Sequence, residues 1–137
     1  MKKKETILGI SIISIVAFFI YCRKQRKNDN PRIFYVKNTF RNYNGYIVPP
    51  FGIVIKNTEK DNADFHKHEM THWKQWQSGG IFFLIDWLKE QKQKGYDLNK
   101  YEIEARKKSG ETAYCQTNYI FCVRNGMAKA FNPNFRT

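Results

Sequence analysis

The chain has 137 residues, of which 42% are hydrophobic and 16% aromatic, enough for one compact domain and hardly for a second. Its 24 Lys and Arg against 12 Asp and Glu give a net charge of +12. Such a charge is found on solvated lysine-rich surfaces, on proteins at anionic membranes and on proteins that bind nucleic acids. Because no arginine-rich stripe with interleaved aromatics concentrates this charge, we expect no nucleic-acid partner.

The N-terminal part is an uncharged, apolar segment over residues 6–22 with basic residues on both sides. This length just reaches what a helix needs to cross a bilayer. Residues 18–22 (FFIYC) are bulky rather than small, which favours an uncleaved anchor over a cleaved signal peptide. We therefore expect a single-pass membrane protein with a transmembrane helix in residues 1–22. Three lysines precede the segment and four basic residues follow it closely, a balance that favours a cytoplasmic domain but leaves the orientation open.

The middle of the chain predicts a linker followed by a small sheet. Residues 23–31 are basic and Asn-rich and end in proline, as in a linker that separates a domain from a membrane. The folded domain is then expected over residues 32–137. Short β-branched and aromatic runs predict strands at 32–37, 45–48 and 52–56.

Helical periodicity begins near Asp61 and repeats in three segments. The first helix is expected to start at Asp61 or Asn62 and to end at Gly79 and Gly80. A second helix over 81–94 has an apolar start (IFFLIDWL), predicted to be buried, and a charged end, predicted to be solvated. A third is expected from the cap Asn99 to Gly110. Together with the strands, these helices predict an α+β domain.

Beyond Gly110 the pattern is weak. Residues 119–123 are consistent with a strand, and Cys115 and Cys122 are either a disulfide or two free thiols. The three cysteines of the chain form no CxxC pair, so a closed structural zinc site built on cysteine is not expected.

The first helix carries the sequence HEMTH at residues 68–72. Positions i and i+4 lie on the same helix face, so His68 and His72 can bind one zinc ion together. Glu69 can reach a water molecule next to the metal and act as general base in amide hydrolysis. The residues that share the helix face with this motif are apolar: Phe65, Trp73 and Trp76, with the two tryptophans expected in the core. The alternative is a pair of hydrogen-bonded core histidines with no metal.

A catalytic zinc site needs a third protein ligand. Gln75 and Ser78 exclude the HExxHxxGxxH arrangement, and His66, two residues before His68, points to another side of the helix. A downstream carboxylate is left as the third ligand.

The succession of HEMTHWKQ, an apolar helix and YEIEA at residues 101–105 resembles the gluzincin metallopeptidases, in particular the small minigluzincins and the ExxA motif of membrane-associated members. The resemblance implies a zincin-like fold over the domain, with Glu102 as the third zinc ligand and Ala105 as the small residue where two helices approach. Arg106 departs from it, since many relatives have a supporting aspartate there. Glu104 competes as the ligand, and Glu102 also occupies the capping-box position after Asn99.

We therefore expect a Zn²⁺-dependent peptidase that acts near a membrane on a peptide or protein, with Glu69 as catalytic base and His68, His72 and Glu102 as metal ligands. The alternatives are a gluzincin-like module that binds metal without turnover and a small basic membrane protein in which HEMTH is incidental. A peptidase also needs a group that stabilises the oxyanion. The chemically suitable candidates are Tyr96, Tyr114, Tyr119 and Arg124.

Overall fold

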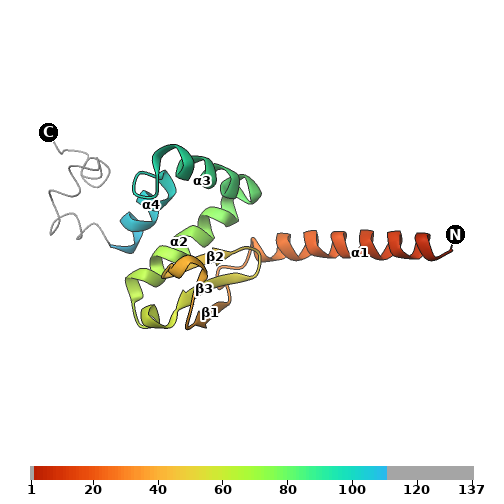
Figure 1. Cartoon of the computed structure of the whole chain (residues 1–137), viewed down its shortest axis with the longest axis horizontal. Helices are drawn as coiled ribbons and strands as arrows, with labels where there is room; N and C mark the ends of the chain where they lie inside the picture. The colour runs from red at the N-terminus through yellow and green to blue at the C-terminus, as the bar shows by residue number, and fades with distance from the viewer. Residues whose placement is uncertain (1, 111–137) are drawn as a thin grey trace.

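The computed structural model describes residues 2–110, with side chains described from Ile13 onward (Figure 1). The chain forms an α+β arrangement in which three helices lie beside a small sheet. In order, the elements are α1 (Lys2–Gln25), β1 (Ile33–Val36), η1 (Phe40–Asn42), β2 (Gly45–Val48), β3 (Gly52–Lys56), η2 (Asn57–Glu59), α2 (Ala63–Gly79), α3 (Ile81–Lys94) and α4 (Lys100–Ser109).

The sheet has the order β1-β3-β2, so that β3 is the central strand. β1 pairs with β3 in parallel, with Ile33 opposite Ile53, and β2 pairs with β3 antiparallel, with Gly45 opposite Ile55. Because side chains alternate along a strand, Ile53 and Ile55 leave β3 on the same face, and both are buried. They pack with Trp73, Trp76 and Phe83 in one hydrophobic cluster. The three predicted strands and the core position of the two tryptophans are confirmed.

α2 begins and ends at the predicted residues. The side chain of Asn62 caps it by accepting a hydrogen bond from the Phe65 N–H at 3.0 Å, and Gly80, at φ 58°, ends it. Thr71, a polar residue of this helix, is buried. α4 packs closely on α2 and covers a face of α2 that the sheet leaves open.

The bounds predicted for α3 and α4 are also confirmed, including Asn99 as the cap of α4. The expectation that the end of α3 is solvated is confirmed, since residues 92–94 are exposed, but the expectation that its start is buried is wrong. Ile81 and Phe82 are 62% and 78% exposed, while Phe83 and, near the other end, Glu90 are buried. Between Phe83 and Glu90 one face of α3 is covered, and burial there follows the helical period.

α1 extends away from the rest of the fold in Figure 1. None of the helices in the described part of the chain is long and apolar enough to span a membrane. The predicted transmembrane helix in residues 1–22 and the predicted single-pass membrane localisation are therefore wrong. Charged residues occupy both ends of this helix, at residues 2–5 and at Arg23 and Lys24, and restrict its uncharged part to residues 6–22.

The residues that follow α1, predicted as a linker, lie against α2. The Arg26 guanidinium donates to the backbone carbonyls of Gln77 and Ser78, each at 3.1 Å, and the Trp73 indole donates to the Asn28 carbonyl at 2.9 Å. These contacts attach the segment to the C-terminal half of α2. The strand expected at 119–123 and the cysteines at 115 and 122 lie outside the described residues.

Candidate metal centre

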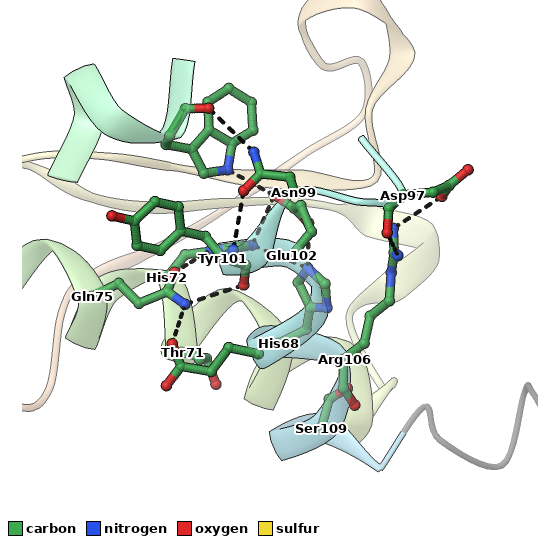
Figure 2. A network of polar contacts seen from close by, with 12 residues as sticks. His68, Thr71, His72, Gln75, Asp97, Asn99, Tyr101, Glu102, Arg106 and Ser109 are labelled. Carbon is green, nitrogen blue, oxygen red and sulfur yellow. Dashed lines mark hydrogen bonds and ion pairs between the residues drawn. The ribbon is translucent and has the colours of Figure 1, made fainter. Parts of the chain in front are cut away.

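The HEMTH sequence occupies the middle of α2 and faces α4 (Figure 2). His68, Glu69 and His72 are all buried. One helical turn separates the two histidines, so their rings meet edge to face with centroids 4.9 Å apart and their Nε2 atoms 3.1 Å apart. The helix thus directs two imidazole nitrogens to one point.

α4 brings a carboxylate to the same point. Glu102 Oε2 lies 3.3 Å from His68 Nε2, and Glu102 Oε1 lies 3.3 Å from His72 Nε2. Ala105, one turn further along α4, is fully buried, and its small side chain lets α4 approach α2. The buried group of His68, His72 and Glu102, whose ligand atoms all lie within 4.8 Å of one another, can hold a metal ion.

The distances within this group fit a small metal ion. A tetrahedral zinc ion with bonds of about 2.0–2.1 Å has its ligand atoms about 3.3–3.4 Å apart. The two histidine Nε2 atoms lie 3.1 Å apart, and each lies 3.3 Å from a different oxygen of the Glu102 carboxylate, which is close to that spacing for each pair. Glu102 Oε2 is also buried, and within residues 2–110 its polar neighbour is His68 Nε2 at 3.3 Å, too poorly aligned for a regular hydrogen bond. A buried carboxylate oxygen in this state is costly unless a cation lies beside it.

The competing residues lie elsewhere. Glu104 is paired with Lys108 at 2.6 Å and accepts from the Gln75 amide, outside the histidine pair. Glu102 does not form a capping box, because its carboxylate faces the histidines while the Asn99 N–H bonds to the Tyr96 carbonyl. His66 lies beside the Tyr35 ring, with centroids 5.9 Å apart.

α3 supports Glu102 through Trp87. The indole Nε1–H donates to Glu102 Oε1 at 2.9 Å. The Trp87 carbonyl in turn accepts from the side chain of Asn99, whose oxygen caps α4 by accepting from the Tyr101 N–H. Asn99 is fully buried, so this chain of hydrogen bonds fixes the start of α4, and with it Glu102, against α3.

Gln75 supports His72 from the other side. Its Oε1 lies 2.8 Å from His72 Nδ1, and its Nε2 donates to the Tyr101 carbonyl at 3.1 Å and to Glu104 at 2.9 Å. Arg106, where the resemblance implies a supporting aspartate, instead bonds to the carbonyl and the carboxylate of Asp97, each at 3.2 Å (Figure 2). Neither Gln75 nor Trp87 was predicted as part of the site.

The charges of the group stabilise one another. Burial alone would raise the pKa of Glu102, but the hydrogen bonds of His68, His72 and Trp87 hold it well below its usual range. Burial alone would lower the pKa of His72, but the hydrogen bond and charge of Glu102, with the charge of Glu69, raise it. The site thus contains an ionised carboxylate that attracts a cation.

Tyr96, on the segment before α4, lies within reach of the charges of Glu102 and Glu69, although 46% of its surface is exposed. Partial burial and the negative charges of Glu102 and Glu69 raise the pKa of Tyr96 above its usual range, so its phenol keeps its proton. The Arg106 guanidinium lies over the Tyr96 ring at 5.0 Å and helps to hold it. Of the four candidates for oxyanion stabilisation, Tyr96 is the one within the described residues; positions 114, 119 and 124 lie outside them.

Comparisons with protein-family models, curated proteins and solved structures give no match to this chain.

Proposed function

We propose that this chain is a zinc-dependent metallopeptidase of the gluzincin type, with His68, His72 and Glu102 as metal ligands and Glu69 as general base. The observation that carries the proposal is the convergence of His68 and His72 from α2 and Glu102 from α4, whose ligand atoms all lie within 4.8 Å of one another. Two imidazoles and one carboxylate are a donor set used by catalytic zinc, which keeps a fourth position for water or substrate.

The choice of zinc follows from the donors. Imidazole nitrogens suit zinc, copper, iron and nickel, and a site with three protein ligands and no thiolate is typical of catalytic rather than structural zinc. When bound, zinc would act as a Lewis acid that polarises a peptide carbonyl and acidifies a water molecule. Peptides and proteins are the substrate class that this chemistry and the HExxH arrangement favour.

The remaining steps fall to residues of the chain. Glu69, buried beside the first ligand, takes a proton from the attacking water as the water oxygen bonds to the carbonyl carbon. It then gives that proton to the amine as the carbon–nitrogen bond breaks, so that the carboxylate is regenerated. Tyr96 keeps its proton and can donate a hydrogen bond to the carbonyl oxygen, which becomes negatively charged.

The test uses the full chain loaded with zinc and incubated with a fluorogenic peptide library and denatured protein. We expect about one zinc per chain and peptide hydrolysis that Glu69→Gln lowers by about 10²–10⁴-fold while zinc stays bound. Glu59→Gln, a matched change on the short η2 helix just before α2, should leave both unchanged.

The outcomes separate the alternatives. Zinc binding with no hydrolysis in the wild type would leave a metal-binding module without turnover. The absence of bound zinc in the wild type would overturn the proposal altogether and leave a buried histidine pair.

A further inference from the structure

Gln75 lies three residues after His72 on α2 and contacts three groups at once. Its side chain meets His72 Nδ1 at 2.8 Å, the Tyr101 carbonyl at 3.1 Å and Glu104 Oε2 at 2.9 Å. Tyr101 immediately precedes Glu102 on α4. One amide therefore contacts the second histidine of the site and the backbone next to its carboxylate (Figure 2).

The partners of Gln75 determine how its amide is oriented. The Tyr101 carbonyl and the ionised Glu104 carboxylate can only accept hydrogen bonds, so the amide NH₂ must face both of them. The amide oxygen is then left for His72 Nδ1, and an oxygen can only accept. His72 Nδ1 must therefore carry its proton, which places the lone pair of neutral His72 on Nε2, the atom that faces His68 and Glu102.

We propose that Gln75 is a positioning residue of the metal centre: it fixes the tautomer and ring orientation of His72 for metal binding through Nε2 and ties the α4 backbone beside Glu102 to α2. This inference rests on the proposed metal site. Metal-binding histidines generally donate their second ring N–H to a carboxylate, a carbonyl or water, which sets the tautomer of the ring. Here the acceptor is a side chain of the same helix.

Arg106 provides an independent reason for this assignment. Its guanidinium is directed to Asp97, on the segment before α4, so the position after Ala105 offers His72 no carboxylate. Gln75 Oε1 is the hydrogen-bond acceptor that the described residues present to His72 Nδ1.

The test is the zinc affinity of the full chain, measured by competition with a chromophoric chelator. We expect Gln75→Ala to weaken zinc binding by about 10–100-fold. Gln75 also lines a surface pocket with Lys74, Ser78 and Phe82, so water can reach the space that the shortened side chain leaves. In ¹⁵N NMR of the zinc-loaded protein, the His72 Nδ1–H signal should be protected from exchange in the wild type and exchange rapidly in the variant.

Two further variants make the test specific. Gln77→Ala removes a glutamine from the same helix that hydrogen-bonds Asn28 instead of the site, and should leave zinc affinity unchanged. Gln75→Glu places a carboxylate against Glu104 and should also weaken binding. The double change Gln75→Glu with Glu104→Gln restores a donor between these two side chains but not to the Tyr101 carbonyl, and should recover part of the lost affinity.

The inference is overturned if wild type and Gln75→Ala bind zinc within twofold of each other and show the same His72 Nδ1–H signal. That result would leave the proposed metal site intact. A wild-type chain that binds no zinc would instead refute the proposed function, and this inference with it.

Discussion

The hydrogen bond between Trp87 and Glu102 offers a quantitative test of how α3 supports the site. The Trp87 indole donates at 2.9 Å to a carboxylate that is 2% exposed and ionised. A hydrogen bond to a charged group contributes about 1.5–3 kcal/mol to stability. Substituting Trp87→Phe keeps an aromatic ring but removes the donor, and Glu102→Met keeps the length of the side chain but removes the acceptor.

A double-mutant cycle isolates this bond from the packing that each substitution also changes. The free energies of unfolding of the wild type, the two single variants and the double variant would be measured by urea denaturation, all with a chelator present so that no metal contributes. We expect a coupling energy of about 1.5–3 kcal/mol. A coupling energy below about 0.5 kcal/mol, the usual scatter between independent sites, would refute the claim that Trp87 holds Glu102 in place.

Three other predictions concern the metal and the framework. Chelation should lower the midpoint of thermal unfolding and added zinc should raise it, with about 4 kcal/mol of stabilisation at a free zinc concentration 1,000 times the Kd; differential scanning fluorimetry with and without His72→Ala checks this. Asn99→Ala should cost about 2 kcal/mol in urea denaturation, because it removes the cap of α4 and the partner of the Trp87 carbonyl. Gly52→Ala should lower the free energy of unfolding by at least about 3 kcal/mol, since Gly52 has φ +149° and the added Cβ would lie 2.1 Å from the Arg32 carbonyl oxygen. As a control, Lys108→Ala breaks an exposed pair with Glu104 and should lower it by less than about 0.5 kcal/mol.

The fold was largely predictable because its determinants are local. Asn62 and Asn99 cap the helices that they precede, and Gly80, Gly95 and Gly110 adopt positive φ where the helices end. The short β-branched runs form the strands. The burial of Thr71 and the exposure of Phe82 were not predictable, because both depend on where α4 and α3 pack. The transmembrane prediction rested on an uncharged run, residues 6–22, that only just reaches the length a span needs, and no helix in the described part of the chain is long and apolar enough to span a membrane.

The candidate site shows the same division between local and distant effects. The spacing of HEMTH is sufficient to bring His68 and His72 together on one helix. The place of Glu102 depends on the packing of α4 against α2, and only the resemblance pointed to it rather than to Glu104. Gln75 was within reach of sequence reasoning, since position i+3 after His72 lies on the same side of the helix. Trp87 was not, because the contact joins two helices whose angle no local pattern determines.

The arrangement of donors and acceptors separates a metal centre from a buried histidine pair. In a buried histidine pair without a metal, each ring N–H would face an acceptor and each ring lone pair would face a donor. Here Gln75 Oε1 makes His72 Nδ1 the donor, so that the lone pair of neutral His72 Nε2 faces a carboxylate oxygen at 3.3 Å, which is also an acceptor. This contact is repulsive unless a cation lies between the two atoms. A proton on His72 satisfies it in the metal-free protein, in line with the raised pKa of His72, and a metal ion satisfies it together with His68 and the second oxygen of Glu102. A metal ion can meet His68, His72 and Glu102 at once, which is what makes this buried group able to hold one.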